Sequence, residues 1–435
     1  MEKSKQLYDR AIKSVPYGVH SNSRYRVPHP IYFKSGKGAY LYDVDGNEYI
    51  DLNCGNGAVM LGHGNEEFER RFYENLKECS GLTTGSETEL AVKAAEVFRK
   101  IFPVDKVRFT NTGTEAITHV MHMARAYTGK NDFALIEGAY NGWTDYVNIS
   151  NFPSLNEVGD AKRPNAVPGS GGLDKKAIDS SLIIPFNDLE ASKELLTENK
   201  DRIAALILEP VMIDVGFIEP EKSYLQGLRT ICDELGILLV FDELLTGFRV
   251  PDGSCQKHFG IVPDLSIFGK AIANGHILAA VAGKDEVMNI AAPIGGKTGY
   301  VGTFNGHAYS MAAGLASMEM LLDGTIREIL DKRTLYLKSE FEKSAKKYGI
   351  TAILNGRGGH LQWYFAESVQ NYRDAAGSNT GNYVNFANAM LEQGILVVPK
   401  PLSHHAITLG HDEEVLEKIV AAMDNALKAA AEKIK

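Results

Sequence analysis

The chain has 435 residues in ordinary globular proportions, 44% hydrophobic and 23% charged. Its formal net charge is −9 and its basic residues are scattered, which argues against nucleic acid as a partner. No apolar stretch approaches the roughly 20 residues that span a bilayer, so we expect no membrane partner. The first residues lack the apolar core of a secretory signal, which predicts a cytoplasmic protein. At this length we expect a large domain and a smaller one.

The first predicted element is an antiparallel pair. Residues 38–52, GAYLYDVDGNEYIDL, alternate apolar and polar side chains around Asp45-Gly46, which is typical of a hairpin. From about residue 86 helices alternate with strands, which predicts a mostly parallel sheet. The predicted helices and strands of this part cover, in chain order, residues 87–102, 106–110, 115–129, 133–138, 203–211, 223–236, 237–243 and 264–270.

Two further segments divide the chain. Residues 151–180 are rich in Pro, Gly, Asn and Ser without a sustained period, so we expect a long loop. From about residue 310, two long helical patterns precede an amphipathic helix over 413–434. We therefore predict three parts: an N-terminal segment, 1–60, that contributes to the small domain; a large domain, 61–309; and a C-terminal small domain, 310–435.

The four cysteines stand far apart and form neither a CxxC pair nor a cluster with histidine. This spacing argues against a structural zinc site and against a disulfide framework. We therefore expect reduced thiols that mostly pack in the core, and no bound metal. They are Cys54, Cys79, Cys232 and Cys255.

The first candidate site follows the strand predicted at 106–110. Thr112 and Glu115 have capping-box spacing, and apolar residues then repeat at helical intervals. Gly113 and Thr114 therefore lie at a helix N-terminus, where free N–H groups and the helix dipole favour an anion such as phosphate. The same residues are also consistent with an ordinary capped helix.

A carboxylate follows a second buried strand. Asp242 comes directly after five apolar residues, at the edge where open parallel sheets bind ligands. A largely desolvated carboxylate needs a cationic partner, because an unpaired buried charge is costly. The candidates are a metal ion, an arginine such as Arg249, or the protonated ring nitrogen of a cofactor.

Lys270 follows a third apolar strand, 28 residues after Asp242. A lysine desolvated at this edge would have a lowered pKa and a more nucleophilic amine. Most lysines instead extend the ammonium group into water, and the segment alone does not separate these interpretations.

Gly296-Lys297-Thr298 resembles the end of a nucleotide-binding P-loop. A phosphate-binding P-loop requires a glycine five residues before the Gly-Lys pair, where this chain has Ala291. No strand precedes it, since residues 284–294 indicate a helix and a loop. The sequence therefore argues against a P-loop nucleotidase.

Taken together, these segments resemble the class III aminotransferases, which are fold-type I enzymes dependent on pyridoxal phosphate (PLP). Within them the glutamate-1-semialdehyde aminomutase subgroup is most similar. The resemblance runs over nearly the whole chain in order: GAYLYDVDGNEYIDL, GHG, TNTGTEA, GAYNGW, EPV, FDELLTGFRV, PDLSIFGK and GTFNGHAYSMAAG. It implies an α/β fold with a mostly parallel central sheet, helices on both faces and a smaller α+β domain.

The resemblance also implies roles for matching residues. Lys270 would form a Schiff base with PLP and move the substrate proton, while Asp242 would pair with the protonated pyridine nitrogen. Gly113 and Thr114 would hold the phosphate. Thr303 would reach the phosphate of a neighbouring subunit's cofactor, which implies a homodimer with shared active sites.

Further family positions concern the ring and the substrate. Tyr140 matches the aromatic residue that stacks on the pyridine face, and Leu244 matches the aliphatic residue on the other face. Glu209 is a position close to the cofactor. Arg24 stands where the aminomutases have an arginine that binds a substrate carboxylate, an interaction that a guanidinium makes bidentately.

Several expected substrate positions depart from the aminomutase pattern. Asn141 replaces the histidine usual after the stacking aromatic, and Asn56 stands about where the aminomutases have a bulky aromatic. His404 and His405 stand where a pocket glutamate is expected. After Lys270, AIANGHILAAV replaces a glycine-rich run. We therefore expect a substrate pocket unlike that of a true aminomutase.

The sequence thus predicts a PLP-dependent aminotransferase that moves an amino group between a small-molecule amino donor and an aldehyde or keto acceptor. An intramolecular aminomutase and a PLP-dependent lyase stay open as alternatives, because both would share every cofactor residue. A non-catalytic PLP-binding protein would be expected to have lost Lys270 or Asp242, and this chain keeps both.

Overall fold

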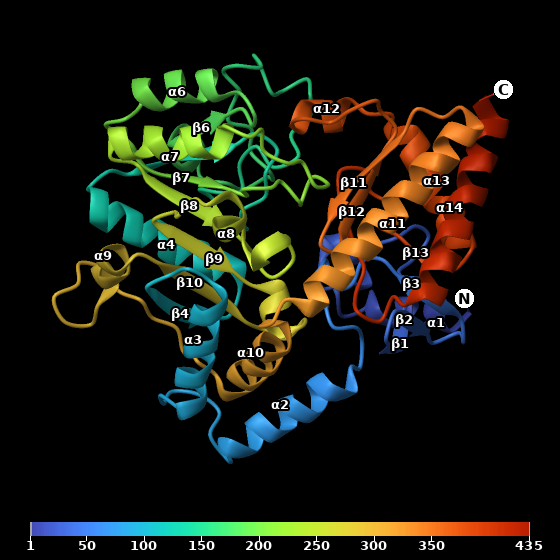
Figure 1. The fold of residues 1–435 in the computed structure, drawn as a ribbon, viewed down its shortest axis with the longest axis horizontal. Helices are drawn as coiled ribbons and strands as arrows, with labels where there is room; N and C mark the ends of the chain where they lie inside the picture. Colours follow the sequence, from blue (N-terminus) through green and yellow to red (C-terminus); the bar gives the residue numbers. More distant parts are fainter. Residues whose placement is uncertain (1, 435) are drawn as a thin grey trace.

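The computed structural model describes residues 2–434 and is built around a seven-stranded sheet (Figure 1). The strand order is β4-β10-β9-β8-β7-β5-β6. Neighbours from β9 to β6 are parallel, whereas β10 is antiparallel to both β9 and β4. This confirms the predicted mostly parallel sheet. The strands are β4 (Lys106–Thr110), β5 (Asp132–Ile136), β6 (Ser181–Ile184), β7 (Ile203–Leu208), β8 (Leu238–Asp242), β9 (Leu265–Phe268) and β10 (Ala279–Gly283).

Helices cover both faces of this sheet, which explains why its central strands are continuous apolar runs. Along β7, Leu206 and Leu208 belong to the apolar cluster that includes α6 (Leu189–Glu198) and α7 (Tyr224–Leu235). Ala205 and Ile207, which point to the opposite face, pack with α4 (Gly113–Thr128). Because helices cover both faces of the sheet, the polar ends of its strands are where a ligand can bind.

The remaining strands form two smaller sheets on one side of the molecule, where both chain ends also lie (Figure 1). The predicted hairpin is confirmed, with Tyr40 opposite Ile50. β13 from the C-terminal part pairs with β3, so the N-terminal segment joins that part. The orders are β1-β2-β3-β13 and β11-β12-β14, with bounds β1 Phe33–Lys37, β2 Tyr40–Asp43, β3 Glu48–Asp51, β11 Ile353–Arg357, β12 His360–Tyr364, β13 Ile395–Leu396 and β14 His405–Ala406.

One contact bears on the domain boundary predicted at 309/310. α10 (Ala308–Leu321), which spans the predicted boundary, packs on α2 (Glu66–Glu78) and α3 (Glu89–Ile101), and the boundary stays a prediction. The other α-helices are α1 Glu2–Ala11, α5 Lys175–Asp179, α8 Cys255–Phe259, α9 Asp285–Met288, α11 Thr325–Tyr348, α12 Tyr372–Gly377, α13 Thr380–Glu392 and α14 Glu413–Ile434. Short 3₁₀ turns are η1 Pro16–Gly18, η2 Asn22–Arg24, η3 Pro251–Gly253, η4 Lys270–Ala273 and η5 Asn289–Ala291.

Several elements of the large sheet region were not predicted, among them β6, α6 and β10. β10 has the sequence AAVAG, and alanine and glycine have low strand propensity. It is held as a strand because β4 and β9 bond to it from both sides. Residues 151–180 form the expected long loop, with only α5 starting inside it.

Two further predictions concern the cysteines and membrane-spanning helices. All four cysteines are buried and unpaired, as expected, and burial raises the pKa of the Cys232 thiol to about 12. Among the helices of residues 2–434, none combines the length and the apolar character needed to cross a bilayer.

Candidate active site

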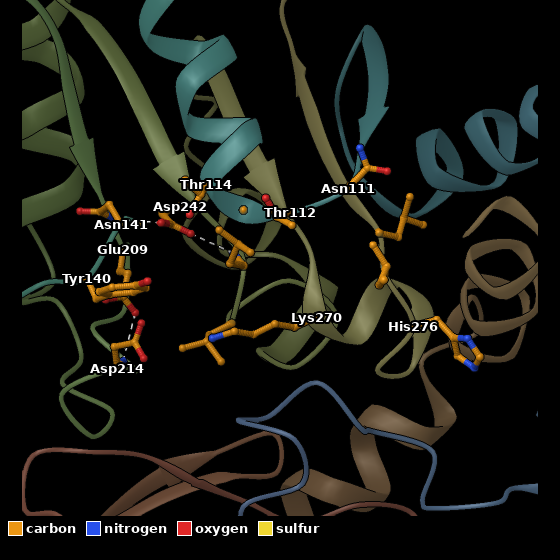
Figure 2. Close-up of a pocket in the computed structure, with 16 residues that line it drawn as sticks. Asn111, Thr112, Thr114, Tyr140, Asn141, Glu209, Asp214, Asp242, Lys270 and His276 are labelled. Carbon is orange, nitrogen blue, oxygen red and sulfur yellow. Dashed lines mark hydrogen bonds between the residues drawn. The ribbon is translucent and has the colours of Figure 1, made fainter. Parts of the chain in front are cut away.

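A cavity of about 310 Å³ lies at the carboxyl edge of the large sheet (Figure 2). Its wall is built by the loops that follow β4, β5, β7, β8 and β9, which all end at this edge. The sheet thus brings together residues far apart in the sequence. Those predicted residues that line the cavity are Gly113, Thr114, Tyr140, Asn141, Glu209, Asp242, Leu244 and Lys270.

Lys270 is the first residue after Gly269 at the end of the β9 region, and its backbone has a φ of 50°. This left-handed conformation is unfavourable for a residue with a side chain, at a cost on the order of 1–3 kcal/mol. The turn that follows is held where Ser317 Oγ donates to the Ala271 carbonyl at 2.9 Å. The Lys270 side chain extends across the cavity toward Tyr140 and Asp214 (Figure 2).

Asp242 ends β8 as a buried carboxylate with two hydrogen-bond donors. Asn141 Nδ2 donates to its Oδ2 at 2.9 Å, and the Leu244 amide donates to its Oδ1 at 3.1 Å (Figure 2). Burial raises the pKa of Asp242 to about 6. This hydrogen bond places Asn141 beside Asp242, although the sequence predicted that Asn141 binds the substrate.

Among the described residues no lysine or arginine forms an ion pair with Asp242, although the Lys270 amine in the same cavity acts against burial and lowers its pKa. Arg249, one of the predicted candidates, instead donates to the carbonyls of Gly57 at 2.8 Å and Val59 at 3.1 Å. No group of three or more His, Cys, Asp or Glu side chains within residues 2–434 is arranged to hold a metal ion. Of the three predicted partners, a protonated ring nitrogen fits the site.

The N-terminus of α4 forms another wall. The Thr112 hydroxyl accepts from the Glu115 amide at 3.2 Å, which leaves the amides of Gly113 and Thr114 for a ligand. The Glu115 carboxylate accepts from the Asn111 amide at 3.0 Å, so it bonds one residue before the position that a capping box uses. The predicted anion site therefore lies at the cavity.

Leu244 packs between two glycines at the base of the cavity. A Cβ atom added at Gly113 would lie 2.8 Å from a Leu244 methyl carbon, and one added at Gly269 would lie 2.6 Å from it. Only glycine at both positions lets this side chain fit between α4 and the strand that precedes Lys270.

A pair of carboxyl groups lies beside Tyr140. Glu209 Oε2 accepts from the amides of Ile213 at 2.9 Å and Asp214 at 3.2 Å, while its Oε1 has no partner among the described residues. Burial raises the pKa of Glu209 well above its usual value, and Asp214 adds to the effect. Burial alone would raise the pKa of Asp214, but Lys270 and His404 outweigh it and lower that pKa. A proton shared by the pair is therefore held more tightly by Glu209 than by Asp214.

Four predicted residues lie outside the cavity wall. Thr303 is exposed in the loop before α10, Arg24 is exposed at the end of η2, and Asn56 is exposed with a φ of 55°. His404 is buried, and its Nδ1 lies 3.4 Å from Asp214 Oδ1. Their predicted roles stay predictions.

Sequence reasoning did not single out Asp214, which lines the cavity five residues after Glu209. The feature of the sequence that could have revealed Asp214 is its place in the loop after β7, because the loops after β8 and β9 also supply site residues. The AIANGHILAAV segment contributes His276, Ile277 and Leu278 to the cavity, in agreement with its departure from the aminomutase pattern.

The sheet and its polar edge define the class of protein, a fold-type I PLP enzyme. The chain belongs to the class-III aminotransferase family, whose model matches residues 21–427. It is 37% identical over 428 residues to a glutamate-1-semialdehyde 2,1-aminomutase of Methanosphaera stadtmanae, with 98% of each chain covered. A relative of the same name in Fusobacterium nucleatum is 35% identical, also with 98% of each chain covered.

Solved structures agree with this assignment. An omega-transaminase from Sphaerobacter thermophilus has a TM-score of 0.92 and 30% identity, and the match covers 98% of this chain and 97% of the other. A transaminase with PLP bound has a TM-score of 0.89 and 28% identity, covering 99% and 98%. The cofactor of this protein is therefore PLP.

The residues at the cavity fit this cofactor. A helix N-terminus is suited to its phosphate, and a buried carboxylate without a cation is suited to its protonated ring. The unpartnered Glu209 Oε1 leaves a polar atom for a ligand, and the Lys270 amine lies within the same space. Gly113, Thr114, Asp242, Tyr140 and Leu244 are thus proposed to hold the group.

The first test concerns Gly113. In Gly113→Ala, the new Cβ would displace Leu244 or the first turn of α4. We expect PLP affinity to fall by at least about tenfold, or about 1.4 kcal/mol, when the absorbance of bound PLP is titrated. Gly171→Ala is the control, because its Cβ would meet nothing within 4 Å. Unchanged PLP affinity in Gly113→Ala would contradict the proposal that the first turn of α4 and Leu244 hold the cofactor.

The second test concerns the charge of Asp242. Without cofactor, its folded pKa of about 6 exceeds the reference value of 3.8, so its contribution to stability falls as pH rises from about 4 to about 6. Asp242→Asn should therefore stabilise the cofactor-free protein at pH 8, by about 2–3 kcal/mol, and weaken PLP binding. Urea unfolding with and without PLP measures both, with Asp201→Asn as the exposed control. A variant less stable than wild type without PLP would refute the argument.

Proposed function

We propose that this protein is a PLP-dependent aminotransferase that moves an amino group from an amino donor to an aldehyde or keto acceptor. The supporting observation is that the Lys270 amine, the buried Asp242 carboxylate and the N-terminus of α4 line a single cavity. These three features match the amine, ring and phosphate chemistry of the cofactor.

When bound, PLP supplies an aldehyde carbon for amine exchange and a ring that accepts an electron pair. Asp242, held by Asn141 and the Leu244 amide, would keep a proton on the ring nitrogen. Tyr140 and Leu244 would hold the two faces of the ring. The Lys270 amine would take the proton from the substrate carbon that bears the amino group and deliver it, across the nitrogen, to the former aldehyde carbon of PLP.

Transfer between two substrates is favoured by the substrate end of the cavity. Asp214 lines the cavity there and lies 3.4 Å from His404, which is buried outside the cavity wall, whereas the aminomutase pattern predicts a glutamate at the His404 position. The similar omega-transaminase structure supports the same choice. An intramolecular aminomutase is the second candidate, because the curated relatives at 35–37% identity carry that name.

Lys270→Ala tests the proposal. We expect the loss of more than about 10³-fold in amino transfer, because no other lysine among the described residues lines the cavity to replace the proton carrier. Rates of keto-acid formation from an amino donor measure it, with Lys297→Ala as an exposed control. A fully active Lys270→Ala variant would sink the assignment.

The same assay separates the two candidates. An aminotransferase releases a keto acid from the donor and aminates a second compound, whereas an aminomutase converts one compound with no free keto acid. Two results would favour the aminomutase. One is conversion of glutamate-1-semialdehyde while no donor yields a keto acid, and the other is that no second compound is aminated.

We also propose a cytoplasmic homodimer with shared active sites. The loop before α10 exposes apolar side chains around Thr303: Ile294 is 91% exposed, Val301 81% and Phe304 56%. Grouped exposed apolar residues mark interaction surfaces. A second copy seated there would bring Thr303 toward the partner's cofactor.

Sedimentation tests the dimer. We expect a mass of twice 47.6 kDa for the wild-type protein, and a shift toward the monomer in Val301→Asp and Phe304→Asp, because a buried charge there would be unpaired. Val262→Asp, at an exposed apolar residue elsewhere, is the control and should stay dimeric. A monomeric wild-type protein would rule out the shared site.

A further inference from the structure

The loop of residues 292–307, which carries Thr303, is largely exposed, but its Tyr300 side chain packs back onto the large sheet region. The Tyr300 ring stacks on the His119 ring of α4, with centroids 3.8 Å apart and an interplanar angle of 13°. The Arg108 guanidinium of β4, the edge strand of the sheet, lies 5.1 Å from the centroid of the same ring. The strand and the helix that flank the phosphate end of the cavity therefore hold one residue of this loop.

Polar groups add to this contact. The Tyr300 hydroxyl donates to the Arg108 carbonyl at 3.3 Å, and Arg108 Nη1 donates to the carbonyl of Ala291, just before the loop, at 3.0 Å. Burial is the main cause that lowers the pKa of His119, so the ring that stacks on Tyr300 is uncharged at neutral pH. A neutral imidazole can lie on the tyrosine beside a guanidinium without like-charge repulsion.

A second contact holds the loop on the other side of Thr303. Asn305 Oδ1 accepts from Asn111 Nδ2 at 3.4 Å, and Asn111 lines the cavity. The Thr84 hydroxyl donates to the Thr303 carbonyl. A Cβ atom added at Gly302 would lie 2.5 Å from Asn305 Oδ1, so the chain turns tightly here. Thr303 is therefore held three residues before, two residues after and at its own carbonyl.

These contacts restrict where Thr303 can lie. Three residues of fully extended chain span at most about 11 Å, so a fixed Tyr300 ring keeps Thr303 close to the edge strand β4. A loop without such contacts would sample many conformations, and the entropy lost on ordering it would reduce the affinity of any ligand that Thr303 binds. In this loop the ordering has taken place before a ligand arrives.

We propose that Tyr300, stacked on His119, is a positioning residue that fixes the loop of residues 292–307 and thereby holds Thr303 in place for the phosphate of the partner subunit's cofactor. The inference rests on the proposed function with shared active sites and deepens it. Tyr300 acts through Thr303, because its hydroxyl bonds Arg108 and it is not among the described residues that line the cavity. The phosphate of the cofactor therefore depends on Tyr300, whereas the pyridine ring does not.

The test compares PLP with pyridoxal, which has the same ring and aldehyde but no phosphate. In Tyr300→Ala we expect PLP affinity to fall by about tenfold in an absorbance titration, while pyridoxal affinity changes by less than about twofold. Tyr300→Phe keeps the ring and loses only the hydrogen bond to Arg108, so its PLP affinity should stay within about threefold of the wild-type value. A general folding defect would instead lower both affinities together.

The stacking partner has a matched control on the same helix. His119→Ala removes the ring beneath Tyr300, so the preference for PLP over pyridoxal should fall by at least about threefold. His122→Ala changes an exposed histidine of α4 and should leave that preference at the wild-type value.

A pair of glycine variants tests the second contact. In Gly302→Ala the new Cβ would collide with Asn305, so the preference for PLP over pyridoxal should again fall by at least about threefold. Gly299→Ala is the control in the same loop, because its Cβ would meet nothing within 4 Å and the preference should not change.

Sedimentation at the concentrations of the titrations separates positioning from assembly. A dimeric Tyr300→Ala variant that loses affinity for PLP but not for pyridoxal would support the proposal. Three results would overturn it: wild-type PLP affinity in Tyr300→Ala, equal losses for PLP and pyridoxal, or a loss that disappears at concentrations where the variant is dimeric. A monomeric wild-type protein would overturn it as well. If the wild type shows the expected preference but transfers no amino group, the aminotransferase proposal fails while the positioning role stands.

Discussion

The burial of the Asp242 carboxylate without a protein cation is the constraint on which the active site depends. Its two oxygens accept from Asn141 and the Leu244 amide, yet neither donor balances the charge. Burial disfavours this charge, and we propose that the protonated ring of PLP pairs with it. The same donors hold the carboxylate in one orientation, which would give the ring nitrogen a single place to bind.

The rest of the cavity is arranged around that position by the sheet. Parallel strands end at a common edge, so the loops after β4, β7, β8 and β9 supply the helix terminus, Glu209, Asp242 and Lys270 to one space. Leu244 packs against Gly113 and links the phosphate end to the ring position. Strain at the Lys270 backbone is kept because the surrounding core leaves its turn no alternative.

The substrate end follows different rules from the cofactor end. The proposed cofactor residues lie at the ends of strands of the large sheet, whereas His404 comes from the C-terminal part and lies 3.4 Å from Asp214. Similar proteins carry the names of both transaminases and aminomutases, so the fold by itself does not fix the reaction.

The sequence by itself determined the local features: the hairpin, the alternation of helices and buried strands, the capped start of α4, and the placement of Asp242 and Lys270 at strand ends. Periodicity and ordered motifs carry such information because they depend on neighbours in the chain. Tertiary structure alone decided that β10 is a strand, that Asn141 bonds Asp242 and that Asp214 faces His404. Those contacts arise where separate elements pack together, and no local sequence pattern specifies which polar groups meet there.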